Sequence, residues 1–155
     1  MTSFNSFNIR KQVSHRCGAV IFNDNMDKIV LILNRYSSEV LKKPKWGLPK
    51  GHINKKVKEA YIKCAEREVL EETGLNIKMD KKNGMIRVNK TNYYPIRLSN
   101  EFSLKPKDTY EVSEAKWIDI KDIKNMVINY ECKLVMEKLN RFKTLARLNR
   151  VNIIK

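Results

Sequence analysis

Two runs of apolar residues near the start of the chain predict a β-hairpin. Residues 15–22 read His-Arg-Cys-Gly-Ala-Val-Ile-Phe and residues 28–34 read Lys-Ile-Val-Leu-Ile-Leu-Asn, so both are short, apolar and β-prone. Asn23, Asp24 and Asn25 stand between the runs, and these residue types favour turns. The pattern predicts two strands that are joined by this turn.

Shorter β-prone runs in the second half of the chain predict further strands of the sheet. They cover residues 76–79, 85–88, 92–98 and 110–118, with a loop or broken strand over residues 99–107. Pro95 favours an edge position or a bulge for its strand, because proline has no N–H to donate to a neighbouring strand. In the last run, the alternating pattern places Trp117 and Ile118 in the core.

Apolar residues at helical spacing predict two helices. The first holds Ile62, Ala65, Val69 and Thr73 within an arc of about 80° and ends at Gly74. The second covers residues 131–148, after a short helix over residues 120–126. Its apolar residues share an arc of about 140°, and they are Leu134, Val135, Leu139, Phe142 and Leu145.

Length and composition indicate one globular domain. With 155 residues the chain is long enough for a single core, which we assign to residues 13–155 with a basic C-terminal helix, after an N-terminal arm over residues 1–12. No apolar stretch approaches the roughly 20 residues of a membrane span, and the start does not resemble a signal peptide. Cys17, Cys64 and Cys132 lack disulfide or zinc spacing. We therefore expect a cytoplasmic protein without a membrane partner.

Three carboxylates gather on the first helix. Glu68, Glu71 and Glu72 stand at i, i+3 and i+4, so they share one face of the helix. Like charges at this spacing repel, unless a cation lies between them. Magnesium prefers oxygen ligands and is commonly shared between carboxylates and substrate phosphates. The alternative is an acidic face that is exposed to water, which is common on helices.

The sequence around these glutamates resembles the Nudix box. The family pattern is glycine, five residues, glutamate, seven residues, and then Arg-Glu-apolar-x-Glu-Glu-x-Gly-apolar; here it runs from Gly51 through Glu59 to Leu75, with seven residues in place of the first five. The preceding residues 46–51, Trp-Gly-Leu-Pro-Lys-Gly, are similar to the loop that leads into this box in Nudix domains. The longer loop after Gly51 is the one departure from the pattern in this stretch.

The resemblance implies an α/β fold with a mixed sheet between helices, and a hydrolase that depends on Mg²⁺ or Mn²⁺. It implies metal ligands at Glu68, Glu71, Glu72 and the carbonyl of Gly51, with Glu71 and Glu72 central to catalysis. Arg67 belongs to the catalytic group as an ion-pair partner that braces the carboxylates, since a guanidinium has no accessible neutral form for proton transfer.

A further glutamate is similar to one in Nudix enzymes that remove mRNA caps. Glu111 stands six residues before Trp117, in a Glu-apolar-x-x-x-x-Trp context. This likeness implies that Glu111 is an extra metal ligand or the general base. Glu114 is the alternative, and an exposed strand glutamate without a catalytic role is also consistent with the pattern.

The charge of the chain points to a polyanionic partner. The net charge is +15. Between residues 40 and 63 there are eight lysines and one glutamate. We expect Lys50, Lys55 and Lys56 of this lysine-rich segment to bind substrate phosphates; Lys42 and Lys43 belong to the same segment. The C-terminal helix adds further cations that would follow an RNA backbone, namely Arg141, Lys143 and Arg147. Solvated basic surfaces are the alternative for both segments.

Together these features predict a hydrolase of a diphosphate linkage in a nucleoside diphosphate joined to another group, with capped mRNA as the leading substrate. Dinucleoside polyphosphates and diphosphoinositol polyphosphates are alternatives, because Nudix enzymes for the former share the Pro-Lys-Gly-His loop and those for the latter need a cationic lip. A non-catalytic binder of RNA or nucleotides is a different class. It is disfavoured because none of the glutamates of the motif is missing.

Overall fold

The computed structural model describes residues 16–35 and 44–154. The expected arm over residues 1–12, and Lys42 and Lys43 of the lysine-rich segment, lie outside the described residues. Within the described ranges, no helix combines the length and the apolar character that a membrane crossing requires.

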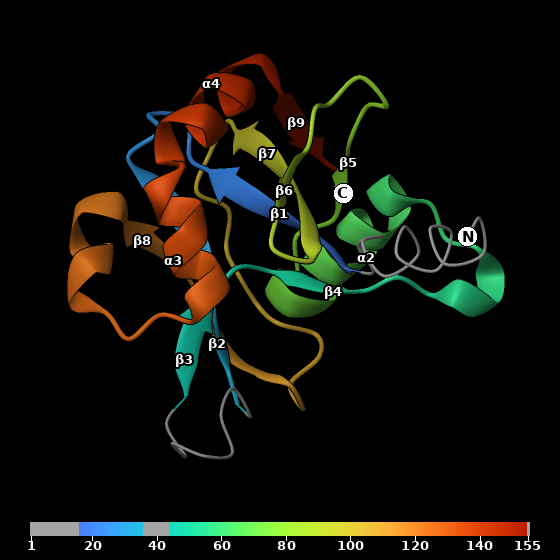
Figure 1. Cartoon of the computed structure of the whole chain (residues 1–155), viewed down its shortest axis with the longest axis horizontal. Coiled ribbons are helices and arrows are strands. Elements are labelled where there is room, and N and C mark those ends of the chain that lie inside the picture. Colours follow the sequence, from blue (N-terminus) through green and yellow to red (C-terminus); the bar gives the residue numbers. More distant parts are fainter. Residues whose placement is uncertain (1–15, 36–43, 155) are drawn as a thin grey trace, which may run out of the picture.

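Both strands and helices are present in the described residues, as expected for an α/β fold (Figure 1). The strands are β1 (Arg16–Phe22), β2 (Lys28–Asn34), β3 (Lys45–Gly47), β4 (Lys50–His52), β5 (Ile77–Lys78), β6 (Ile86–Val88), β7 (Thr91–Leu98), β8 (Val112–Asp119) and β9 (Arg150–Ile153). The helices are the 3₁₀ turns η1 (Lys55–Val57) and η2 (Ile120–Asn125) and the α-helices α2 (Tyr61–Thr73), α3 (Tyr130–Glu137) and α4 (Leu139–Leu148).

The predicted hairpin is present, and it opens away from its turn. Phe22 pairs with Ile29 beside the turn, where the buried Asn23 side chain accepts hydrogen bonds from the backbone N–H groups of Asp27 and Lys28, each at 3.0 Å. Farther from the turn, the first residues of β1 pair with β4 and the last residues of β2 pair with β3. On its other side, β2 pairs with β8 along its length. The short strand β4 therefore lies at the fork between β1 and β2.

The strand that contains Pro95 is central, so the predicted edge position is wrong. β7 pairs in parallel with β1 along its length, and on its other side it pairs first with β6 and then with β9. Pro95 lies between these two short partners, and its carbonyl accepts a hydrogen bond from Asn149 Nδ2 at 3.2 Å. The missing N–H faces this gap, because the N–H and C=O of one strand residue point to the same side.

The core lies on both faces of the sheet. On one face, Cys64, Ala65 and Val69 of α2 pack against β1 and β7. On the other face, Cys132 and Val135 of α3 and residues of α4 pack against β1, β2 and β6. The mixed sheet between helices is thus confirmed, and α2 lies on the opposite face of the sheet from α3 and α4 (Figure 1).

The C-terminal part differs from its prediction in two ways. The expected helix over residues 131–148 is two helices that meet at Lys138, whose φ of −109° and ψ of 21° depart from helical values. The apolar spacing continues across this break, so the spacing did not reveal it. After the basic helix α4, the chain forms the short strand β9, which the sequence did not predict, and Val151 is buried where β9 pairs with β7.

The last predicted strand begins two residues later than expected, and its end is less buried than expected. Glu111 precedes β8 and lies in a turn, while Trp117 and Ile118 are half-buried because they lie at the margins of the two core clusters. The predicted loop over residues 99–107 is present without a strand.

Candidate active site

Helix α2 carries the three glutamates and buries two of them. The helix ends at Gly74, whose φ of 78° is left-handed and whose N–H donates to the Leu70 carbonyl at 3.0 Å. Glu68 and Glu72 are only 7% and 3% exposed. The side chain of Glu71 is 40% exposed. The face that the sequence predicted therefore turns inward at two of its three carboxylates.

Burial sets the electrostatics of this face. It raises the pKa of Glu68 to about 7 and the pKa of Glu72 to about 8, because water no longer stabilises the charged forms. The charge of Arg67 acts against this effect at Glu68, and the N–H of Lys50 acts against it at Glu72. A carboxylate that is buried in this way gains most from an added cation.

Arg67 braces the carboxylates, as the sequence predicts. Its guanidinium forms a two-pronged pair with Glu59, from Nε to Oε2 at 2.8 Å and from Nη2 to Oε1 at 2.9 Å. Its Nη1 donates to Glu68 at 2.8 Å and lies 3.3 Å from Glu71 Oε1. Its Nη2 also donates to the His52 carbonyl at 2.9 Å. One cation thus joins β4, the loop that follows it and α2.

The longer loop after Gly51 does not prevent this contact. Its residues form η1, and Lys58 then turns the chain with a left-handed φ of 50°. The Glu59 N–H donates to the Asn54 carbonyl at 3.2 Å, and the Asn54 N–H donates to the Glu59 carboxylate at 3.1 Å. The loop closes on itself, and Glu59 still reaches Arg67.

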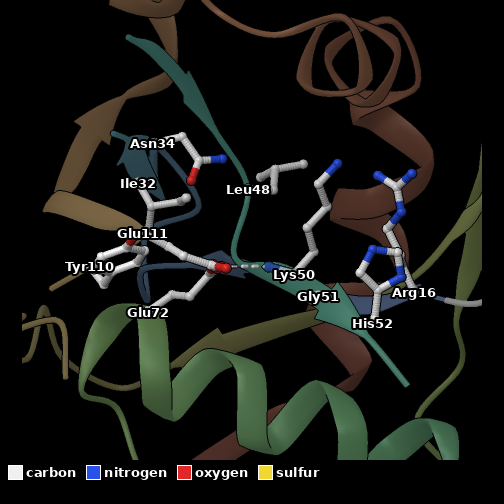
Figure 2. Close-up of a pocket in the computed structure, with 10 residues that line it drawn as sticks. All are labelled: Arg16, Ile32, Asn34, Leu48, Lys50, Gly51, His52, Glu72, Tyr110 and Glu111. Atoms are coloured by element: carbon white, nitrogen blue, oxygen red, sulfur yellow. Dashed lines mark hydrogen bonds between the residues drawn. The ribbon is translucent and has the colours of Figure 1, made fainter. Parts of the chain in front are cut away.

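Strand β4 lies directly against the carboxylates. The Lys50 N–H donates to Glu72 Oε1 at 2.8 Å, which Figure 2 shows as a dashed line. A Cβ at Gly51 would lie 2.1 to 2.2 Å from the carboxyl atoms of Glu68, so a larger residue there would displace the Glu68 carboxylate. The carbonyl of Gly51 accepts a weak hydrogen bond from Cys64 Sγ at 3.7 Å, which places it beside α2.

The loop before β8 brings Glu111 to the same place. The N–H groups of Lys107 and Asp108 both donate to the Glu71 carbonyl at 2.8 Å, which fastens the loop to the end of α2. The Glu111 carbonyl then accepts from the Arg35 N–H at 2.8 Å. Glu111 is exposed and lines the cavity, whereas Glu114 projects from β8 and lies 3.9 Å from Lys116 Nζ. Its position on the cavity wall therefore favours Glu111 over Glu114 as the candidate for the extra metal ligand or general base.

A cavity of about 330 Å³ opens beside these groups. In Figure 2, Arg16 and His52 lie at one end and Asn34, Ile32 and Tyr110 at the other. The carboxylates of Glu72 and Glu111 lie between the two ends, with Leu48, Lys50 and Gly51 completing the wall. The volume is at the lower end of the range of about 300 to 1,000 Å³ for small-molecule sites. The cavity therefore combines a cationic end, an acidic middle and an end with apolar and amide groups.

The donors at this site suit a hard divalent cation. The available atoms are carboxylate oxygens and a backbone carbonyl, which are the ligands that Mg²⁺ and Mn²⁺ prefer. In the part of the chain that the structure describes, no three histidine, cysteine, aspartate or glutamate side chains are gathered closely enough to hold a metal by themselves. Magnesium fits such a site, because it usually takes one or two carboxylates and completes its shell with water and substrate phosphates.

The predicted substrate-binding cations are widely separated. Lys50 lines the cavity, but its ammonium group pairs with Glu131 of α3 at 2.9 Å. Lys55 and Lys56 are exposed on η1 and are not among the residues that line the cavity. Arg141, Lys143 and Arg147 lie on α4, across the sheet from α2. The structure thus does not gather these residues into one surface.

Sequence reasoning missed several residues of the site. Arg16, His52, Asn34 and Tyr110 line the cavity, and Glu131 pairs with its lysine. Arg16, Asn34 and Tyr110 lie within predicted strands without forming a motif of their own. His52 belongs to the Pro-Lys-Gly-His loop, but no role was assigned to it. Glu131 carried one signal, an acidic residue inside a helix that was predicted to be basic.

The NUDIX domain profile matches residues 14–134 of the chain. The chain therefore belongs to the Nudix family of hydrolases. Over 112 residues it is 34% identical to the m7GpppN-mRNA hydrolase of Saccharomyces cerevisiae, a match that covers 68% of this chain and 11% of that protein. Over 113 residues it is 33% identical to a putative mRNA-decapping protein of Acanthamoeba polyphaga mimivirus, covering 61% of this chain and 31% of that protein. The chain thus matches only a minor part of either relative.

Solved structures share the fold. The NUDIX domain of Shewanella oneidensis NrtR, complexed with ADP ribose, aligns with a TM-score of 0.65 at 19% identity, over 83% of this chain and 87% of that one. An Ap4A hydrolase of Caenorhabditis elegans aligns with a TM-score of 0.62 at 19% identity, over 85% of this chain and 98% of that one. The likeness establishes the Nudix fold.

Proposed function

We propose that the protein cleaves a diphosphate linkage in a nucleoside-diphosphate-linked substrate, and that this substrate is capped mRNA. The observation that carries the proposal is the position of Glu72, a buried carboxylate on the wall of a cavity that Glu111 also lines. Nudix hydrolases generally use a divalent metal such as Mg²⁺. An mRNA substrate would place the protein in the cytoplasm.

Different residues of the cavity would have different roles in hydrolysis. Glu68, Glu71, Glu72 and the Gly51 carbonyl are the groups that would supply ligands to Mg²⁺ or Mn²⁺, with water and substrate phosphates completing its shell. The metal, when bound, lowers the pKa of water and neutralises charge on phosphate oxygens. Arg67 keeps Glu68 and Glu71 in place.

Glu111 accepts the proton of the attacking water. The water oxygen bonds to phosphorus as the bond from phosphorus to the bridging oxygen breaks, and the bridging oxygen leaves with the departing phosphate. Arg16 offers a positive charge, and His52 offers ring nitrogens, for contact with the remaining phosphates.

Capped mRNA is supported by two independent features. Of the two relatives described above, one is named an m7GpppN-mRNA hydrolase and the other a putative mRNA-decapping protein. The chain also carries a net charge of +15, with Arg141 and Arg147 exposed on α4, far beyond what a small nucleotide requires. RNA that extends from the cavity around the sheet would bind these cations through its backbone phosphates.

A small dinucleoside polyphosphate is the second candidate. The end of the cavity with Arg16 and His52 is within reach of a short polyphosphate that makes no contact with α4. Diphosphoinositol polyphosphates suit the same end, but they leave the opposite end, with Asn34 and Tyr110, unused.

A substrate panel tests the proposal. The purified protein is incubated with Mg²⁺ and with capped RNA, a short cap analogue, diadenosine tetraphosphate, a diphosphoinositol phosphate or a nucleoside triphosphate, and each product is identified. We expect capped RNA to release a methylated guanosine diphosphate and to be cleaved faster than the cap analogue. Preferential cleavage of diadenosine tetraphosphate would replace the mRNA proposal with the second candidate, and no cleavage of any substrate would favour a non-catalytic binder.

A further inference from the structure

A buried ion pair ties β4 to α3, on the side of β4 that faces away from the carboxylates of α2. Lys50 Nζ lies 2.9 Å from Glu131 Oε1, and the two side chains are only 16% and 5% exposed. Figure 2 shows the Lys50 side chain extending away from Glu72, while its backbone nitrogen points to the Glu72 carboxylate. One residue therefore links two buried glutamates, through its backbone on one side and its side chain on the other.

Glu131 is itself firmly held. The hydroxyl of the buried Tyr93, on β7, donates to the same carboxylate oxygen, and Asn89 Nδ2 lies 3.5 Å from the other oxygen. Burial alone would raise the pKa of Glu131, but the hydrogen bond from Tyr93 and the charge of Lys50 outweigh burial and lower this pKa below its ordinary value. Glu131 is thus a charged anchor with partners from three parts of the fold.

The loop between β3 and β4 is fastened to the same part of the fold. The Trp46 N–H donates to the Val127 carbonyl at 3.0 Å, and the Asn129 N–H donates to the Trp46 carbonyl at 2.9 Å. A Cβ at Gly47 would lie 2.2 Å from the Asn129 side-chain nitrogen, so the two segments are in close contact. Asn129 also caps α3 by accepting from the Cys132 N–H at 2.8 Å. The start of α3 therefore supports both ends of this loop.

We propose that Glu131 is a positioning residue for the active site, which acts through Lys50 to set the place of β4 and hence of the Glu72 carboxylate and Gly51. The inference rests on the proposed function, because it concerns the carboxylates that would hold the metal. It also changes the role that the sequence suggested for Lys50, whose ammonium group binds a residue of its own chain. Residues that orient metal ligands typically contribute about 10- to 100-fold to metal affinity or activity.

Three variants test this inference by metal binding and by kinetics. Glu131→Gln keeps the shape but removes the charge opposite Lys50, Lys50→Met removes the cation, and the double variant removes both. We expect Glu131→Gln to weaken Mn²⁺ binding, measured without substrate by water proton relaxation, by about tenfold. The kcat for capped RNA should fall by a similar factor with little change in KM. The double variant should be no worse than Lys50→Met alone, because both residues act through one contact.

Glu137→Gln is the matched control on the same helix, because Glu137 is exposed and lies outside the cavity. If Glu131→Gln does not fold, Tyr93→Phe tests the same anchor, since it keeps the ring and removes the hydroxyl that binds Glu131. A folded Glu131→Gln protein with normal Mn²⁺ binding and normal kcat would overturn the inference. So would effects of the two single variants that simply multiply in the double variant. Mn²⁺ binding tests positioning even if the wild-type protein cleaves none of the panel substrates.

Discussion

Glu72 and Glu131 are both buried, and both contact Lys50, yet their surroundings differ. Glu131 faces an ammonium group and a tyrosine hydroxyl, so its pKa lies below the ordinary value in spite of burial. Glu72 has a backbone N–H from Lys50 and the nearby charges of Glu68 and Glu111, and burial raises its pKa to about 8. The first site is electrostatically complete and serves the structure. The second has a raised pKa and lies on the wall of a cavity, which is the pattern of a candidate functional group.

The largest expected effect is the loss of turnover in Glu72→Gln. The amide keeps the shape and the contact with the Lys50 N–H but removes the charge that would neutralise a metal. We expect kcat for the preferred panel substrate to fall by about 100- to 1,000-fold, which is the scale for removing one preorganised electrostatic group. Circular dichroism should show an unchanged fold. Near-normal turnover in the folded variant would contradict the assignment of Glu72.

Glu111→Gln should give the next largest effect. If Glu111 accepts the proton of the attacking water, kcat should fall by about 100-fold, the lower end for general bases, while Mn²⁺ binding stays nearly normal. Glu114→Gln is the matched control, because Glu114 lies nearby on β8 and outside the cavity. A full rate in Glu111→Gln together with a slow Glu114→Gln would transfer the role to Glu114.

The cations of α4 should matter only for long substrates. Arg141→Glu combined with Arg147→Glu should weaken the binding of long capped RNA and flatten the plot of log affinity against log salt, by about 0.7 for each phosphate that the variant no longer neutralises. Cleavage of short cap analogues should be unchanged, because α4 lies across the sheet from α2. An unchanged salt slope would remove α4 from the RNA path.

The smallest effects are opposite pH dependences of stability in metal-free protein. The folded pKa of Glu131 lies below the unfolded value of 4.5, so its contribution is present above that value and is lost as the pH falls through the folded pKa. The folded pKa of Glu72 is raised from 4.5 to about 8, so its contribution is full below pH 4.5 and declines as the pH rises to about 8. Thermal melts across pH in EDTA should show the acid loss reduced in Glu131→Gln and the alkaline loss reduced in Glu72→Gln. The same pH profile in both variants would contradict the comparison.

Local patterns predicted the parts of the fold that local contacts determine. The hairpin at Asn23, the helix that ends at Gly74 and the ion pair between Arg67 and its glutamates all follow from nearby residues or a fixed spacing. Pro95 was misplaced because its missing N–H faces a gap between β6 and β9, and β9 begins 55 residues farther along the chain. The pair of Lys50 and Glu131 spans 81 residues, and no periodicity or motif records such a contact.

The most direct test of the account is the effect of Mg²⁺ on thermal stability without substrate. A ligand that binds only the folded state raises Tm, so the account predicts that Mg²⁺ stabilises the wild-type protein and that this gain largely disappears in Glu72→Gln. Glu137→Gln should retain the full gain. A wild-type protein that Mg²⁺ does not stabilise, or an equal gain in Glu72→Gln, would contradict the claim that the carboxylates of α2 form a site for a divalent cation.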